Sequence, residues 1–240
     1  MKFSLIICVD KEWGFAKNSQ IPWSIPKENE HFIKTVTKVE LGNTNAYLVG
    51  KKSWEMETPE QRSFLLKNCH VLVLSRTGKM SIPKNEQGYV CSSFDRALQK
   101  LALQSYEINN VFICGGFEIY IESLKRGLIT DCIISKIDNT FGCDLHIRSL
   151  NEYLKSNFTI KETIFNETFK VEYWRNSGTN ILQNFKRTCT FEVHGIKLDV
   201  FVSDLRVCEE YPMFECSLTR CLKFLLEQSF YFRKKKSYSL

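Results

Sequence analysis

The sequence predicts an α/β fold, with a mainly parallel central sheet flanked by helices and closed by antiparallel strands. Short β-rich runs alternate with helical patterns over the first two-thirds of the 240 residues. Several strand ends open into glycine turns or basic residues, and apolar residues make up 43% of the chain, which is enough for one good core. Strand-turn-helix order is typical of a parallel sheet with helices on its faces.

The expected elements follow one another along the chain. Strands are expected at residues 3–9, 46–49, 71–74, 111–114 and 132–137. Helices are expected to start at Glu28 and Lys51, and to span residues 94–103 and 118–124. Residues 158–164 and 169–174 alternate in a way that favours a closing antiparallel pair.

The composition changes near residues 176–180, so we expect one domain over residues 1–178 and an extension over 179–240. Apolar residues alternate on both sides of His194-Gly195, which predicts a β-hairpin. An amphipathic helix should follow, because Leu218, Cys221, Leu222 and Leu225 recur at helical spacing.

The ten cysteines are scattered singly and none has C-x-x-C spacing, so we interpret them as reduced thiols of a cytoplasmic protein with no metal site. The first apolar run, residues 3–9, is too short to span a bilayer and follows no basic leader. A solvated tail is the expected role of the basic run 233–236, which supplies part of the net charge of +6. We therefore expect neither a membrane nor a nucleic-acid partner.

One acid is directed towards the core. Pro22 and Pro26 stiffen the approach to a helix, so Glu28 is delivered to the first helical turn. Phe32 lies four residues later on the same face, and a carboxylate on that face is costly unless it has a partner. The alternative is an ordinary helix-start acid that is favoured by the helix dipole.

Three strand ends carry ligand-binding chemistry: Gly50 before Lys51-Lys52-Ser53, Ser75-Arg76, and Gly115-Gly116 before Tyr120. Glycine allows close backbone approach, and exposed N-H groups with cations suit a phosphate. Each feature alone has an ordinary explanation as a solvated basic pair or a plain turn. Together they indicate a ligand at the carboxyl ends of the strands.

In this order, the motifs resemble those of the dihydrofolate reductase family over roughly residues 3–175. The likeness is carried by residues 9–18, 21–26, 28–32, 50–54, 71–76, 115–120 and 134–137. What the resemblance implies is reduction of 7,8-dihydrofolate to 5,6,7,8-tetrahydrofolate, in which NADPH gives a hydride to the pterin.

The resemblance also implies residue roles. Glu28 matches the acid that binds the pterin, Ser135 the hydroxyl that braces this acid, and Trp23 the tryptophan that holds an active-site water. The implied substrate pocket comprises Glu28 and Ser135 with Ile6, Cys8 and Phe32. The implied cofactor-binding residues are Cys8, Phe15, Lys51, Lys52, Ser53, Ser75, Arg76, Gly115, Gly116 and Tyr120. Of these, Lys51 and Arg76 match positions near the 2′-phosphate of NADPH, whereas Glu30 does not fit the register of the acid.

The sequence departs from the family pattern where the substrate's tail would bind. Cys69 stands in place of the arginine that grips the folate α-carboxylate, and a thiol cannot replace a bidentate guanidinium. Arg62, Lys67 and His70 are the nearby candidates to compensate, and Asn29 replaces an apolar pocket residue. Two alternatives stay open: a weakly active or non-catalytic binding protein, and a reductase of a tail-less pterin-like substrate.

Other departures concern the cofactor and the C-terminal segment. Ala16 and Ser19 replace customary glycines in the loop over the cofactor, and Phe117 replaces a small residue after the paired glycines. Residues 179–240 lie outside the resemblance, although 209–227 faintly resembles the opening helix of thymidylate synthase. The chain is far too short for a synthase domain, so we expect an extension that covers the sheet or contacts a protein partner.

Overall fold

A computed structural model describes residues 2–39, 42–78, 80, 82, 87–104, 107–177, 187–193 and 196–202. The backbone contacts divide the chain into two units, Met1–Ser177 and Gly178–Leu240, and each is described by itself. Within the described residues, no helix is both long and apolar enough to cross a membrane.

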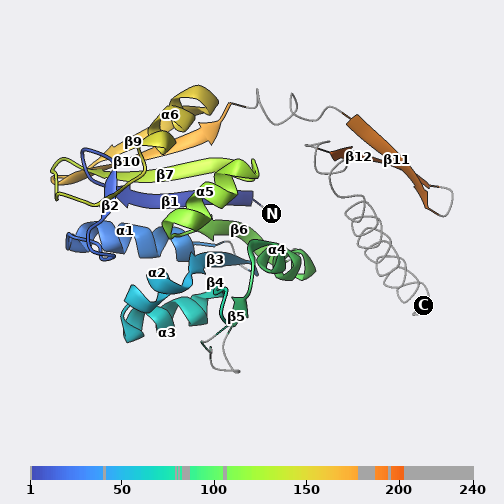
Figure 1. The fold of residues 1–240 in the computed structure, drawn as a ribbon, viewed down its shortest axis with the longest axis horizontal. Helices are drawn as coiled ribbons and strands as arrows, with labels where there is room; N and C mark the ends of the chain where they lie inside the picture. Colours follow the sequence, from blue (N-terminus) through green and yellow to red (C-terminus); the bar gives the residue numbers. More distant parts are fainter. Residues whose placement is uncertain are drawn as a thin grey trace. The chain divides into compact units, whose positions relative to one another are not determined.

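The first unit is built on an eight-stranded sheet (Figure 1). In spatial order the strands are β5 (Gly88–Cys91), β4 (Cys69–Leu74), β3 (Thr44–Gly50), β6 (Ile108–Ile113), β1 (Lys2–Val9), β7 (Asp131–Ile137), β10 (Phe169–Asn176) and β9 (Phe158–Phe165). Neighbours from β5 to β7 are parallel, while β10 is antiparallel to both β7 and β9. The predicted α/β class, with its closing antiparallel pair, is confirmed.

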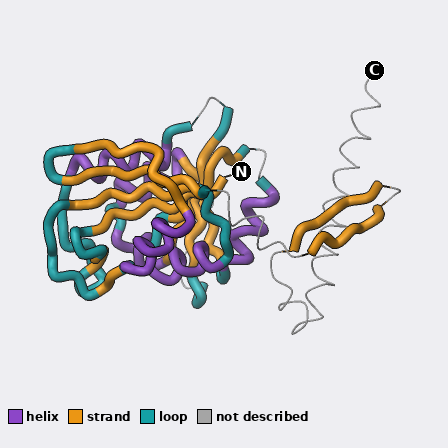
Figure 2. The backbone as a smooth tube through the Cα atoms, turned by 90° about the horizontal axis from the view of Figure 1, so that it is seen from above, coloured by secondary structure: helices purple, strands orange, loops and turns teal. Residues whose placement is uncertain are grey.

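Helices pack on both faces of the sheet (Figure 2). One face carries α1 (Pro26–Thr37), α2 (Lys51–Met56) and α3 (Pro59–Asn68). The other carries α4 (Phe94–Leu103), α5 (Phe117–Lys125) and α6 (Arg148–Asn157). Successive strand residues alternate between the two cores, as Leu5 and Ile7 pack on the α4–α6 side and Ile6 packs on the α1–α3 side.

Several elements were not predicted. These are α3, α6 and β5, and also the short pair β2 (Gly14–Ala16) and β8 (Leu145–His146). In α3 the apolar residues do not share one face, because Phe64 is exposed while Leu65 and Leu66 are buried. Strands of two or three residues are too short to show a hydrophobic periodicity. The pairing of β2 with β8 also joins distant parts of the chain, so no local pattern indicates it.

In the second unit, β11 (Arg187–Val193) and β12 (Ile196–Val202) pair antiparallel. The turn predicted at His194-Gly195 and the helix predicted over 218–225 lie outside the described residues, as does the basic run 233–236. The hairpin-and-helix form of the whole extension therefore stays a prediction.

Candidate active site

Glu28 lies in the first turn of α1, where the local sequence places it. Pro26 is the first helical residue, and Ile25 before it is extended, with φ −124° and ψ 94°. The backbone N-H of Glu28 donates to the Ile25 carbonyl over 3.0 Å. The side chain is half-buried and points towards Ser135 and Cys8 of the sheet.

The Glu28 carboxylate is held by two donors from adjacent strands. The Ser135 hydroxyl of β7 and the Cys8 thiol of β1 both hydrogen-bond to it. Cys8 and Ser135 are register partners in the parallel β1–β7 pair, so their side chains leave the sheet on the same face. Burial raises the pKa of Glu28, and the two hydrogen bonds oppose that rise because they favour the charged form.

The other acid of this turn is different. Glu30 is exposed and pairs with Lys34 over 2.6 Å, and this hydrogen-bonded partner lowers its pKa. Glu30 therefore has the surroundings of a solvated surface acid, whereas Glu28 has those of an enclosed one.

Aromatic side chains enclose the space beside Glu28. Trp23 packs against Phe141 with ring centroids 5.2 Å apart. Phe32, one helical turn beyond Glu28, meets Tyr47 edge-to-face at 6.2 Å. Both Trp23 and Phe32 join the apolar cluster that contains Ile6. The acid thus lies beside a cluster of apolar and aromatic side chains.

The paired glycines and Tyr120 meet at the end of β6. The Gly50 N-H donates to the Gly115 carbonyl over 2.7 Å, and Gly115 has φ +121°, which side chains rarely adopt. A Cβ added at Gly116 would lie 3.2 Å from the Ser53 hydroxyl. The Tyr120 hydroxyl donates to the Ile6 carbonyl over 2.9 Å. These contacts join α5, α2 and β1 at one edge of the sheet.

Phe15 and Phe117 cover this edge. The Phe15 ring stacks on Phe117 at 6.1 Å, with an interplanar angle of 7°, and meets Tyr120 edge-on at 6.5 Å. Phe117 is the first residue of α5 and its side chain is exposed. Phe117, which departs from the family pattern, therefore contacts one predicted cofactor residue, Phe15.

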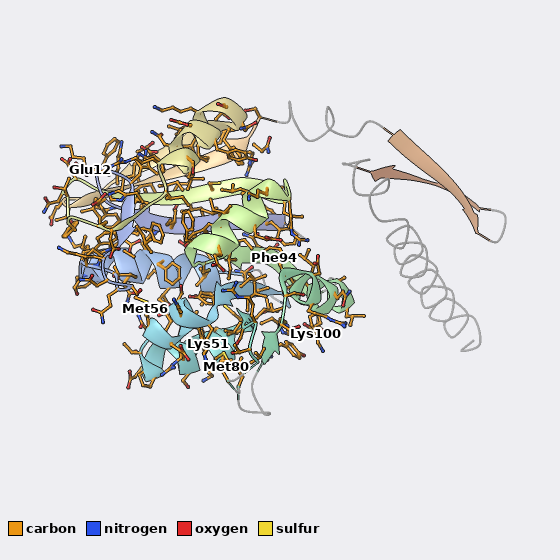
Figure 3. The ribbon with its side chains drawn as sticks, in the orientation of Figure 1. Glu12, Lys51, Met56, Met80, Phe94 and Lys100 are labelled. Carbon is orange, nitrogen blue, oxygen red and sulfur yellow. The ribbon has the colours of Figure 1, made fainter. Side chains whose placement is uncertain are left out.

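The predicted phosphate residues gather at neighbouring strand ends. Lys51, Lys52 and Ser53 form the first turn of α2 directly after β3, and Figure 3 labels Lys51 there. Ser75 and Arg76 follow β4, whose end is level with that of β3. Ser75 is buried and its hydroxyl has no hydrogen-bond partner, which leaves a polar atom available to a ligand.

Two of these cations have acidic neighbours. The Lys51 ammonium lies 3.6 Å from Glu55, and the Arg76 guanidinium lies 3.5 Å from Glu118. Both side chains in the Arg76–Glu118 pair are more than three-quarters exposed. A bound phosphate would compete with Glu118 for Arg76.

The loop that carries Phe15 is tied down by a buried acid. Asp10 accepts the backbone N-H groups of Gly14 over 2.7 Å and Phe141 over 3.2 Å. Ala16 pairs with β8, and Ser19 has φ 61°, a left-handed conformation that glycine adopts at lower cost. The two residues that replace glycines thus occupy a paired and a strained position.

The Cys69 side chain is closed off from solvent. Cys69 is 0% exposed, its thiol donates to the Val36 carbonyl over 3.6 Å, and burial raises its pKa to about 12. His70 is directed to the opposite face of β4, because strand residues alternate. The Gln61 amide donates to Asn29 over 3.2 Å and joins α3 to α1.

A half-buried acid, Glu57, also lies near this region, and it was not predicted from the sequence. Glu57 follows α2 and accepts the Tyr47 hydroxyl over 3.1 Å, while burial raises the pKa of Glu57. Arg62 acts electrostatically on this carboxylate. The capping box between Thr58 and Gln61 was the sequence signal that could have located α3 and its neighbours.

Comparisons with known proteins identify relatives of this chain. A family model described as dihydrofolate reductase matches residues 2–174. A putative dihydrofolate reductase of Caenorhabditis elegans is 31% identical over 153 residues, which cover 62% of this chain and 79% of the relative. The dihydrofolate reductase of Aedes albopictus is 28% identical over 172 residues, covering 69% and 91% respectively.

A bifunctional dihydrofolate reductase-thymidylate synthase of Arabidopsis thaliana is 31% identical over 152 residues. That match covers 62% of this chain but only 29% of the bifunctional protein. With the family model spanning most of the chain, this protein belongs to the dihydrofolate reductase family.

Proposed function

We propose that this protein catalyses the NADPH-dependent reduction of 7,8-dihydrofolate to 5,6,7,8-tetrahydrofolate. The observation that carries the proposal is the half-buried Glu28 carboxylate, whose pKa is raised by burial and partly lowered again by Ser135 and Cys8, and which lies beside a cluster of apolar and aromatic side chains. Membership of the family implies folate metabolism. An enclosed acid with fixed geometry is what binding and orienting a pterin requires.

In this proposal, Glu28 accepts hydrogen bonds from the pterin amino group and ring N-H, and favours protonation of the ring. Ser135 holds the orientation of Glu28. Trp23, Ile6 and Phe32 provide an apolar cleft that excludes water from the reacting atoms, and exclusion of water strengthens every charged interaction inside it.

The residues at the strand ends fit NADPH, because the buried Ser75 hydroxyl lacks a partner and the glycine pair leaves space that a Cβ would restrict. Phosphate contacts come from Lys51, Lys52, Ser53, Ser75 and Arg76, and contacts to the nicotinamide end come from Cys8, Phe15, Gly115, Gly116 and Tyr120. When bound, NADPH supplies the hydride. The side chains orient it and neutralise its phosphates.

The central test compares two acids of one helix. Glu28→Ala is expected to lower the rate of NADPH oxidation with dihydrofolate by at least about a hundredfold, because positioned acid-base groups contribute about 10²–10⁴. Glu30→Ala is the matched control, and its rate should equal that of the wild type, because Glu30 is exposed and paired with Lys34. An unchanged rate in Glu28→Ala refutes the assignment.

A second candidate function is reduction of a pterin-like substrate without a glutamate tail. It is supported by Cys69, which is fully buried and bonded to Val36, so it presents no charge to a carboxylate. The two candidates separate when NADPH oxidation is measured with dihydrofolate and with a tail-less dihydropterin. Turnover of the tail-less compound alone favours the second candidate.

A non-catalytic binding protein is the remaining alternative. NADPH and methotrexate binding without turnover of either substrate would favour it. Against it, the phosphate-site cations and the bracing of Glu28 by Ser135 serve no evident purpose in a scaffold.

We also propose a cytoplasmic location and a two-part organisation, with the reductase over residues 1–178 and an extension over 179–240 that binds a protein partner. The contact-based division after Ser177 supports the boundary. The unpaired thiols of the described cysteines are compatible with a reducing compartment.

A further inference from the structure

Glu172 of β10 is a buried acid that takes no part in the proposed reaction. Its carboxylate has three partners: the Lys136 ammonium lies 2.8 Å from one oxygen, the Lys170 ammonium lies 2.9 Å from the other, and the Trp174 indole N-H donates to the first over 3.1 Å. Burial favours the neutral acid, but the hydrogen bonds from the two lysines lower the pKa of Glu172, so the carboxylate stays charged. The acid therefore fixes two cations at the surface of the sheet.

The two lysines differ in what else they contact. Lys136 and Lys170 are register partners in the antiparallel β7–β10 pair, and both lie on the α4–α6 side of the sheet. The Lys136 ammonium lies 4.5 Å from the centre of the Trp13 ring, whereas the contact described for Lys170 is the one with Glu172. A cation over an indole face attracts it, and the attraction grows as water is excluded. Lys136 thus joins the sheet to the loop that follows β1.

Trp13 is held in this loop in a conformation that a bulky residue rarely adopts. Its φ is +65°, its N-H donates to the Asp10 carbonyl over 3.0 Å, and its own carbonyl accepts the Ile147 N-H over 2.9 Å. Such a conformation persists only where the surroundings stabilise it. The Lys136 ammonium supplies one such contact, from the side of the ring.

The position of Trp13 decides where Phe15 lies, because the two are separated by a single residue, Gly14. The Phe15 ring stacks on Phe117 and meets Tyr120 at the edge of the sheet where the predicted cofactor residues gather. A loop that leaves the sheet at Trp13 would withdraw Phe15 from both rings.

We propose that Lys136 is a positioning residue: Glu172 holds its ammonium against the Trp13 ring, and this contact keeps Phe15 at the cofactor edge of the sheet. The consequence for the cofactor rests on the proposed function, whereas the anchoring of the loop does not.

The first experiment is amide hydrogen exchange followed by NMR in the full chain, with neither substrate nor cofactor added. Lys136→Met should speed exchange of the Gly14 and Ile147 amides by roughly two- to thirtyfold, the range for loss of one cation-π contact. The Cys114 amide, which bonds to the Leu48 carbonyl, is the reference for opening of the whole sheet.

Lys170→Met is the matched control, because it also removes one cation from Glu172 but leaves Trp13 untouched. Relative to the Cys114 reference, its Gly14 and Ile147 amides should exchange as in the wild type. Lys136→Arg should restore slow exchange, since a guanidinium also pairs with an acid and lies over an indole. Equal effects of Lys136→Met and Lys170→Met overturn the proposal, because the role of Lys136 would then be only to neutralise Glu172.

A second variant removes the ring and keeps the ion pair. Trp13→Leu should speed exchange of the Gly14 and Ile147 amides as Lys136→Met does, and adding Lys136→Met to it should bring no further rise. An equal effect of Lys136→Met with and without the Trp13 ring overturns the proposal.

Release of NADPH tests the consequence for the cofactor. NADPH should dissociate from Lys136→Met faster than from the wild type, and from Lys170→Met at the wild-type rate, when the complex is mixed with excess NADP⁺ in a stopped-flow instrument. An unchanged dissociation rate in a variant whose loop exchange has risen overturns the link to the cofactor. A wild type that does not bind NADPH refutes the proposed function, while the exchange measurements still decide the role of Lys136.

Discussion

The two ends of the proposed substrate cleft differ in whether a polar side chain is available to a ligand. At the inner end, Glu28 is half-buried and its carboxylate has donors on adjacent strands, Cys8 and Ser135. At the outer end, between α1 and α3, Cys69 is completely buried and its thiol bonds to a backbone carbonyl. At the inner end the Glu28 carboxylate is available to a ligand, whereas at the outer end Cys69 presents no charged group.

From this difference we expect the proposed cleft to select the ring of a substrate more strongly than its tail. Fixed donors around Glu28 favour one planar, hydrogen-bonding group. Across the outer end, the Gln61–Asn29 hydrogen bond joins two helices, and Glu57 adds a second acid near that end. A carboxylated tail would meet an acid there, with Arg62 as the nearby cation.

Cys69→Arg is expected to have the largest effect among the variants that test the difference between the two ends. A guanidinium placed at a fully buried site within an apolar cluster should lower the free energy of unfolding by about 3–5 kcal/mol. Urea unfolding measures this loss. Cys69→Ala is the control, with an expected loss of about 1 kcal/mol from the missing sulfur contacts. A stable Cys69→Arg variant that gains affinity for dihydrofolate would mean that the outer end is open.

The pH dependence of Glu28→Gln tests the inner end. Burial raises the pKa of Glu28 above 4.5, so the folded protein binds more protons than the unfolded chain between pH 4.5 and the folded pKa. Wild-type stability should therefore fall as pH rises through that window, whereas Glu28→Gln should not show this fall. Thermal unfolding measured from pH 4 to 8 should show that the stability of Glu28→Gln rises relative to that of the wild type as pH increases.

Glu30 lies on the same helix, and its expected contribution to the pH dependence of stability has the opposite sign to that of Glu28. The partner Lys34 lowers the pKa of Glu30 below 4.5, so its contribution is present above that pH and is lost as pH falls. Equal pH profiles for the Glu28 and Glu30 variants would contradict the contrast between an enclosed and a solvated acid.

Thr58→Ala weakens the helix that walls the outer end. Thr58 and Gln61 form a capping box at the start of α3, and loss of such a cap costs about 1 kcal/mol. Ser93→Ala removes the cap of α4 on the other face of the sheet and should cost a similar amount. We expect only Thr58→Ala to change the ratio of dihydrofolate to tail-less pterin affinity, which calorimetric titration measures.

Asn29→Ala should have the smallest effect on folding, within about 0.5 kcal/mol, because its hydrogen bond to Gln61 is exposed. It removes the link between α1 and α3, so KM for dihydrofolate should fall relative to KM for a tail-less dihydropterin. Gln99→Ala, which breaks an exposed hydrogen bond to Arg96 on α4, is the control. An equal change in both KM values would sink the idea that this link restricts the tail.

The sequence by itself determined the order of the longer strands β1, β3, β4, β6, β7, β9 and β10, and the position of Glu28 in a first helical turn. These features follow from local sterics, since proline fixes the approach to α1 and glycine alone suits the backbone of Gly115. It also indicated the cations after β3 and β4, because the ends of parallel strands meet at one edge of a sheet.

Only the tertiary structure decided which side chains meet. Cys8 and Ser135 are 127 residues apart and become partners through the β1–β7 register, which no local pattern encodes. The same holds for the sealing of Cys69 by Val36 and for the direction of His70. Local sterics fix where the chain turns, but long-range pairing fixes the face and depth of each side chain, and these decide whether an acid is enclosed or solvated.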